Sequence, residues 1–411
     1  MTTAGNPDVS VDHDDHFLHM HPGSDTLVVY FSALNVEKRK FNFMNLGRAL
    51  PTHALFVNDL TQRWYQHGVA GLGASLDETC ASIQGMAERL GATQIRAVGS
   101  SMGAFGALLA TRIPGCAALA FSPECRLGLP RSRSRKSYCG DIVPGTADLR
   151  TVLTQDDIAA TIVFGESEPM DLSAAAQFAG IGALELIGLR GVDHYASSHL
   201  NRAGVLEAAL QRFFDKRALG DLESLPRAPL EHGQWRPLAG VGGALGAGAY
   251  PRTLLEAHLA EIRAEWPEML ERAEKAVALY PQGDMGWRML GRARLMHGRI
   301  ADSIGPLGAA LALAERDPLT RYYLANAMRK LGMAAEARRH LRILIRRWPD
   351  FGRAYYELSL LAQADGDMQD AVGLLEQGVQ AEPRRTVLRD RLADLQRRIG
   401  AATPAEPGAS T

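Results

Sequence analysis

The sequence predicts two folds in one chain: an α/β domain with a doubly wound, mostly parallel sheet, followed by an all-α solenoid of paired helices. From Thr26 onward, short β-branched runs alternate with longer amphipathic stretches, which is the pattern of strands joined by crossover helices. Beyond residue 250, small and apolar residues recur with a period of 34, the period of helix-pair repeats. The 411 residues, 46% apolar and 22% charged, are ordinary for a globular protein of two or three domains.

Charge and hydropathy exclude several classes of protein. Lysine and arginine number 45 against 46 acidic residues, a formal net charge of −1, so the chain lacks the strong basic field of a nucleic-acid-binding or anionic-membrane protein. No run of about 18 apolar residues predicts a membrane span, and the polar start has no secretory pattern. The four cysteines form no CxxC pair, so we expect reduced thiols and a cytoplasmic location.

Composition shifts divide the chain into five predicted segments. Residues 1–24 are expected to be a disordered tail, and 25–216 an α/β domain. Proline and glycine dominate 217–250, which predicts a linker. Residues 251–400 carry the helical repeats, and 401–411 are expected to be a second disordered tail.

The N-terminal tail is rich in side chains that can bind metal. These are His13, Asp14, Asp15, His16, His19 and His21. Histidines three residues apart could approach one ion if the segment were helical. A solvated tail without metal is the favoured interpretation.

The α/β pattern can be followed strand by strand. Predicted strands are Thr26–Phe31, Thr52–Val57, Gln94–Gly99, Cys116–Phe121, Ala160–Gly165 and Ala183–Ile187. Predicted helices between and after them include Leu76–Leu90, Met102–Arg112 and Ala203–Phe214. Continuous apolar runs, as at 27–29 and 162–164, are typical of strands covered on both faces.

The motif Gly99-Ser100-Ser101-Met102-Gly103 lies between a predicted strand and an apolar helical run. G-x-S-x-G in this context predicts a nucleophile elbow, with Ser101 on a strained turn at the top of the sheet. Glycines are needed on both sides because the strand and helix pass closely there. The alternative is a tight turn without chemistry.

With this motif, residues 25–215 resemble the α/β-hydrolase fold. The resemblance implies the order nucleophile, acid, histidine along the chain. Glu168, three residues after the strand-ending Gly165, takes the acid's place; the family more often has aspartate, so Asp171 is the second choice. His194 follows the last predicted strand and would act as the base, oriented by the acid. His199, five residues later, is the second choice for the base.

The resemblance also implies an oxyanion hole made of two backbone N–H groups. One would come from Met102, after the nucleophile. The other would come from Ser32 or Ala33, after the first strand. Phe31-Ser32 stands where many hydrolases have a His-Gly pair, which is a departure from the family pattern.

Other residues bear on the substrate. Asp59, Trp64 and Tyr65 follow the second strand and would suit a sugar or polar acyl ligand; a helix cap and ordinary packing are the alternative. This region also resembles bacterial hydrolases that accompany surface-polysaccharide enzymes. A basic cluster at 131–136 could attract an anionic substrate, although a solvated loop is the favoured interpretation.

Residues of the same type recur at intervals of 34 positions. The glycine series is Gly298, Gly332 and Gly366, the leucine series is Leu307, Leu341 and Leu375, and the proline series is Pro349 and Pro383. With Trp287, Leu290 and Gly291 at the start of the first full repeat, this pattern resembles the tetratricopeptide repeat family. Three repeats cover 284–385 and a capping helix 386–399. In the second repeat Arg321 replaces the aromatic residue.

The resemblances imply a serine hydrolase, an esterase or thioesterase acting on a small acyl or acylated-sugar substrate, joined to a module that binds a protein or peptide partner. Expected partner contacts are Arg288, Arg292, Asn326 and Arg329. The alternative is an interaction scaffold with a catalytically degenerate hydrolase domain. No HExxH, P-loop or GxGxxG occurs in context, so no cofactor is expected.

Overall fold

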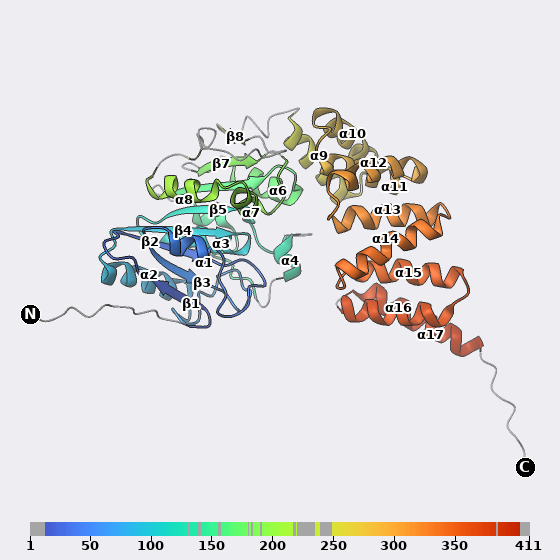
Figure 1. Ribbon diagram of the computed structural model, residues 1–411, viewed down its shortest axis with the longest axis horizontal. Coiled ribbons are helices and arrows are strands. Elements are labelled where there is room, and N and C mark those ends of the chain that lie inside the picture. The colour runs from blue at the N-terminus through green and yellow to red at the C-terminus, as the bar shows by residue number, and fades with distance from the viewer. Residues whose placement is uncertain are drawn as a thin grey trace, which may run out of the picture. The chain divides into compact units, whose positions relative to one another are not determined.

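The computed structural model contains two compact units, residues 1–255 and 256–411, coloured along the chain in Figure 1. The structure describes residues 13–129, 132–137, 141–154, 158–179, 181, 184–189, 191–216, 219, 235–238, 249–383 and 385–402. Among the described helices, none combines the length and hydropathy that a membrane-spanning segment requires.

The first unit is built on one mixed sheet with strand order β1-β3-β2-β4-β5-β6-β7-β8. The strands are β1 His16–His19, β2 Thr26–Phe31, β3 His53–Val57, β4 Gln94–Ser100, β5 Ala117–Phe121, β6 Ala159–Gly165, β7 Leu184–Leu189 and β8 Trp235–Leu238. The six inner strands pair in parallel, whereas β1 and β8 pair antiparallel at the two edges.

The edge strands correct two predictions. β1 lies in the predicted tail, and β8 lies in the predicted linker. Both are four-residue strands whose polar or proline-containing sequences carry no apolar run, so their pairing partners rather than their own patterns define them. His16 of β1 pairs with Val57 of β3, and Leu238 of β8 pairs with Leu186 of β7. Residues 1–12 and most of 217–250 lie outside the described residues.

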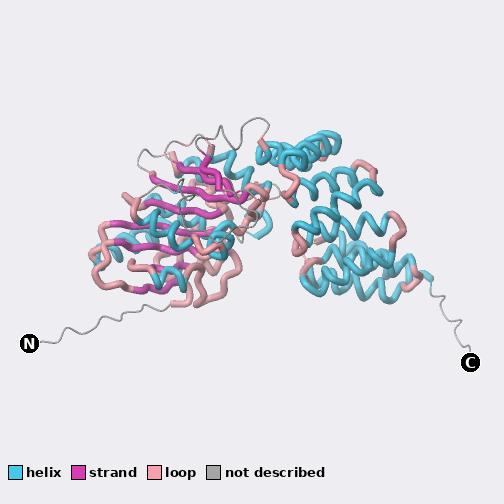
Figure 2. The backbone as a smooth tube through the Cα atoms, turned by 45° about the horizontal axis from the view of Figure 1, so that its top comes forward, coloured by secondary structure: helices cyan, strands magenta, loops and turns pink. Residues whose placement is uncertain are grey.

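Helices cover both faces of this sheet (Figure 2). They are α1 Met44–Ala49, α2 Leu76–Leu90, α3 Met102–Leu109, α4 Arg133–Ser137, α5 Leu149–Val152, α6 Pro169–Phe178, α7 Ala196–Arg202 and α8 Leu206–Phe214. All six residues of β2 are buried, as its continuous apolar run predicts. One core packs Val28, Tyr30 and Phe56 of the sheet against Leu210 and Phe213 of α8.

The second unit consists of helices in antiparallel pairs. Its helices are α9 Tyr250–Arg263, which begins just before the unit boundary, α10 Trp266–Leu279, α11 Asp284–Met296, α12 Ile300–Leu313, α13 Pro318–Lys330, α14 Ala334–Arg347, α15 Gly352–Ala364, α16 Met368–Ala381 and α17 Thr386–Ala402. Pairs α11/α12, α13/α14 and α15/α16 correspond to the three predicted repeats.

The repeated slots have the predicted physical roles. Gly298, Gly332 and Gly366 have φ of +82°, +78° and +84°, the left-handed conformation that ends the first helix of each pair. Leu307, Leu341 and Leu375 are fully buried between the helices. The period therefore reflects one helix-pair unit repeated three times.

Three cysteines of the first unit, Cys80, Cys116 and Cys125, are free thiols; Cys139 lies outside the described residues. Burial raises the pKa of Cys80 to about 11 and the pKa of Cys116 and Cys125 to about 12. Such thiols stay protonated near neutral pH and are poor nucleophiles.

Candidate active site

The turn between β4 and α3 presents Ser101. β4 ends at Ser100 and α3 begins at Met102. Ser101 has φ 55° and ψ −118°, a strained conformation for a residue with a side chain. The strain is tolerated because Ser101 N–H donates to Phe121 O at 2.8 Å, which pins the turn to β5.

The glycines on either side are required by close backbone contacts, as predicted. A Cβ at Gly99 would lie 2.0 Å from the carbonyl oxygen of Gly103, and a Cβ at Gly103 would lie 2.1 Å from the carbonyl oxygen of Phe31. No larger residue fits either position without moving β2 or α3. The G-x-S-x-G motif is therefore a geometric necessity of this turn.

Three side chains far apart in sequence form a continuous chain of hydrogen bonds. Nε2 of His194 lies 2.8 Å from Oγ of Ser101. Nδ1 of His194 lies 3.0 Å from Oδ1 and 3.1 Å from Oδ2 of Asp171. The Asp171 side chain is only 1% exposed, while that of His194 is 13% exposed. The three side chains have the geometry that a nucleophile, a base and an orienting acid require.

The acid position corrects the first choice, Glu168. Glu168 is the N-cap of α6: its Oε1 accepts the Met170 N–H at 3.2 Å, and Pro169 follows at the first helical position. The capping bond turns this carboxylate toward its own helix. Asp171, one turn further along, reaches His194 instead.

Arg133 is a site residue whose role the sequence did not predict. From α4 its Nη1 donates to Asp171 Oδ1 at 3.0 Å, and its Nη2 lies 3.5 Å from Glu168 Oε2. Burial alone lowers the Arg133 pKa, but the carboxylates of Asp171, Glu168 and Glu124 outweigh it and raise the pKa above the usual value. A permanent cation thus lies beside the acid. Arg131 of the same basic cluster lies outside the described residues.

The predicted oxyanion donors differ in availability. Met102 begins α3, so its N–H has no partner within the helix. The Ser32 N–H donates to Val57 O at 2.9 Å, and the Ala33 N–H donates to Asn42 Oδ1 at 2.6 Å. Both candidates for the second donor are therefore occupied in this conformation, because β3 and Asn42 take their hydrogen bonds.

The predicted substrate contacts at Asp59, Trp64 and Tyr65 are wrong. Asp59 is 4% exposed and accepts the backbone N–H groups of Thr61, Arg63 and Tyr65. Trp64 and Tyr65 are each 1% exposed, and the Tyr65 hydroxyl donates to Ser32 O at 2.8 Å. These residues fold the loop after β3 and cannot reach a ligand.

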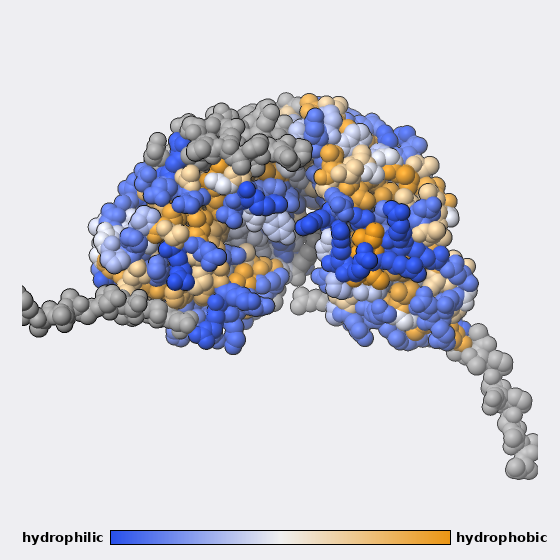
Figure 3. All heavy atoms as spheres, viewed as in Figure 1, coloured by the Kyte–Doolittle hydropathy of each residue, from blue (hydrophilic) through white to orange (hydrophobic). Residues whose placement is uncertain are grey.

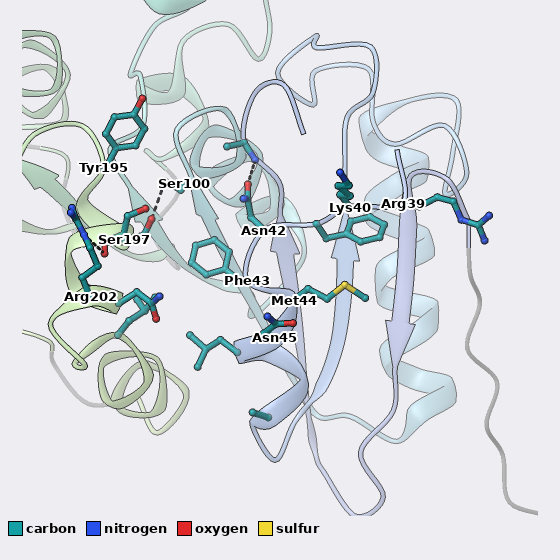
Figure 4. Close-up of a pocket in the computed structure, with 17 residues that line it drawn as sticks. Arg39, Lys40, Asn42, Phe43, Met44, Asn45, Ser100, Tyr195, Ser197 and Arg202 are labelled. Atoms are coloured by element: carbon teal, nitrogen blue, oxygen red, sulfur yellow. Dashed lines mark hydrogen bonds between the residues drawn. The ribbon is translucent and has the colours of Figure 1, made fainter. Parts of the chain in front are cut away.

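A pocket of about 1030 Å3 lies next to the hydrogen-bonded chain. One wall is the segment after β2, which includes Asn42 and Phe43, and the other is α7 (Figure 4). Ser100 and Tyr195, the chain neighbours of Ser101 and His194, belong to the lining. Tyr195 is 64% exposed. The pocket therefore opens at the chain neighbours of Ser101 and His194, although neither of these two residues lines it.

The histidine-rich segment is packed on the sheet. Metal-ligating atoms of His13, Asp15 and His16 lie within 4.8 Å of one another. Asp15 already accepts the Gly71 N–H at 2.8 Å and contacts His16 Nδ1 at 2.8 Å. These bonds explain the cluster as an anchor for β1.

In the repeat unit, all four predicted partner contacts are bonded internally. Arg288 pairs with Asp317 at 2.8 Å, and Arg292 pairs with Glu261. Asn326 and Arg329 both bind Glu357, at 2.7 Å and 2.5 Å. Their structural bonds tie neighbouring helix pairs together, and their role in partner binding stays a prediction.

Comparison with known proteins concerns part of the chain. No family model matches the sequence. A segment of 170 residues, 40% of the chain, is 28% identical to the cytochrome c-type biogenesis protein CycH of Rhizobium meliloti (strain 1021). The chain spans 43% of the length of that protein.

Solved structures similar to this chain contain helical repeats. MamA (residues 41 to end) of Desulfovibrio magneticus RS-1 covers 38% of the chain and 88% of its own length, with 16% identity and a TM-score of 0.34. YrrB, described as a TPR protein with an unusual peptide-binding site, covers 36% of the chain and 76% of its own length, with 17% identity and a TM-score of 0.32. The helix pairs of this chain and their 34-residue period by themselves give this part of it a tetratricopeptide-like repeat fold.

Proposed function

We propose that the main function of this protein is that of an interaction scaffold. In this function the repeat unit binds an acidic peptide segment of a partner protein. Stacked helix pairs form extended surfaces suited to such binding. The comparisons with known proteins concern helical repeats and support this function more directly than a catalytic one.

The charge on α14 supports an acidic partner. Arg339, Arg342 and Arg346 are exposed and follow one another at spacings of three and four residues, on one face of the helix. None of the three has an ion-pair partner within the part of the chain that the structure describes. By contrast, Arg338 and Arg347 are paired with Asp365 and Glu315. Strongly hydrophilic residues gather over the middle of this unit in Figure 3.

The scaffold proposal is tested with a fluorescein-labelled peptide that alternates glutamate and leucine. We expect saturable binding to the full-length protein, measured by fluorescence anisotropy, and weakening by at least about tenfold in Arg339→Glu/Arg342→Glu, because each lost charge pair becomes a repulsion. Arg389→Glu/Arg398→Glu changes two exposed arginines on α17 and is the matched control. Equal weakening by the control would point to nonspecific charge attraction.

We further propose that the first unit is a serine hydrolase acting on esters or thioesters. The single observation that supports it is the hydrogen-bonded chain Ser101–His194–Asp171. The occupied Ser32 and Ala33 N–H groups favour the rival proposal, a degenerate hydrolase domain, unless Asn42 moves when substrate binds.

In the proposed reaction, Ser101 Oγ attacks the ester carbonyl carbon while His194 Nε2 takes the hydroxyl proton. The developing oxyanion is stabilised by the Met102 N–H at the start of α3. His194 returns the proton to the departing alcohol or thiol, and water then releases the acid from Ser101 by the same two steps. Asp171 keeps Nδ1 of His194 protonated and in position.

A fluorophosphonate probe tests this proposal, since it forms a covalent bond only with an activated serine. We expect labelling of the wild-type protein at Ser101, and its loss in Ser101→Ala. Ser100→Ala changes the neighbouring hydroxyl and should retain labelling. If the wild-type protein stays unlabelled while a known serine esterase is labelled under the same conditions, the catalytic proposal fails.

A further inference from the structure

The pocket beside Ser101 has two chemically different parts. Its apolar part comes from the segment after β2 and from α8: Phe41, Phe43, Met44 and Leu206 line it. Phe41, Phe43 and Met44 are partly buried and also pack on the sheet core, so this part of the pocket is continuous with the core. A volume of about 1030 Å3 suffices for a ligand the size of a substituted acyl ester.

Arg202 is the positive charge available to a ligand in this pocket. Of the three cationic residues in the lining, Lys40 pairs with Glu37 at 2.6 Å, and Arg39 lies 4.0 Å from Asp14. Arg202 has no carboxylate partner among the described residues. Its Nε donates weakly to Ser198 O, at 3.4 Å, so most of its five N–H donors remain for another acceptor.

Figure 4 shows how Arg202 is placed. Its side chain runs along α7 on the same wall as Tyr195, and Phe43 and Met44 lie on the opposite side. Ser197 Oγ donates to Ser100 Oγ at 3.3 Å and closes the wall next to the nucleophile. Ser100 and Tyr195, the chain neighbours of Ser101 and His194, line this pocket together with the apolar side chains and the Arg202 guanidinium, whereas Ser101 and His194 do not line it themselves.

We infer that the substrate is an ester whose apolar chain carries an anionic group, a carboxylate or a phosphate, that binds Arg202. This inference rests on the proposed hydrolase function and names its substrate class. A neutral lipid ester would leave the guanidinium without a partner, whereas an anion forms a charge-assisted pair that holds the chain in register.

Matched esters test the inference with the full-length protein. Mono-p-nitrophenyl adipate and p-nitrophenyl hexanoate have the same six-carbon acyl chain and differ in its end. We expect kcat/KM to favour the adipate ester by at least about tenfold. Arg202→Gln should remove this preference and Arg202→Lys should keep part of it. Arg89→Gln, which changes an exposed arginine on α2, should leave it intact. 4-Acetoxybenzoate and phenyl acetate form a second pair, in which the carboxylate is on the alcohol part of the ester instead of the acyl part. An Arg202-dependent preference for the anionic ester in either pair supports the inference.

Two failures can be told apart. If both members of each pair are hydrolysed with equal kcat/KM, the substrate class is wrong and the hydrolase proposal stands. If no ester is hydrolysed and Ser101 is not labelled, the hydrolase proposal fails. In that case, calorimetry with the Ser101→Ala protein measures the affinity of the pocket for adipate and for hexanoate. If adipate binds no more tightly than hexanoate, the inference about Arg202 is wrong.

Discussion

Replacing Asp171 with Asn should lower kcat/KM for an activated ester by about 10⁴-fold, while Glu168→Gln should cost less than about tenfold. An Asn side chain fills the same space but presents an amide to His194 Nδ1, which favours the wrong imidazole tautomer for accepting the Ser101 proton. Glu168 caps α6 by accepting the Met170 N–H. The amide oxygen of glutamine can accept the same hydrogen bond, so Glu168→Gln should retain most of the capping interaction.

The measurement is steady-state turnover of p-nitrophenyl esters, together with thermal unfolding of each variant. Unfolding matters because Asp171 is buried and binds Arg133 at 3.0 Å, so Asp171→Asn also weakens that pair. Similar losses from the two substitutions, or a larger loss from Glu168→Gln, would show that the acid is assigned to the wrong carboxylate.

Removing the Glu357 side chain should lower the free energy of unfolding of the repeat unit by about 3 kcal/mol. Glu357 is 3% exposed and accepts hydrogen bonds from Tyr322 at 3.2 Å, Asn326 at 2.7 Å and Arg329 at 2.5 Å. Glu357→Ala would leave these donors on α13 without their acceptor and would separate α13 from α15. Urea unfolding followed by circular dichroism at 222 nm measures the change.

Glu376→Ala is the matched control, because Glu376 is an exposed glutamate on α16; its effect should stay within about 0.5 kcal/mol. A double-mutant cycle of Glu357→Ala with Arg329→Met separates their pairwise interaction from the other bonds. If Glu357→Ala unfolds at the same urea concentration as the wild type, the network contributes nothing to stability.

The sequence by itself determined the helix-pair repeats and the turn at Ser101, because both depend on residues close together in the chain. The 34-residue period identified three helix pairs, because the turn glycines and buried leucines have the same role in each pair. The spacing of Gly99, Ser101 and Gly103 identified the turn, because two backbone approaches near 2 Å exclude any side chain there. The resemblance to the α/β-hydrolase fold implied a histidine after the last strand, and His194 lies after β7.

Only the tertiary structure decided which side chains meet across these elements. Glu168 and Asp171 are one helical turn apart, and a capping bond, invisible in the sequence pattern, directs the first away from His194. Asp59, Trp64 and Tyr65 look like a binding surface, yet Asp59 accepts backbone N–H groups and the other two side chains are buried in the core. β1 and β8 exist because neighbouring strands supply their hydrogen bonds. In each case the outcome depends on partners distant in sequence, and their positions are set only when the whole sheet has formed.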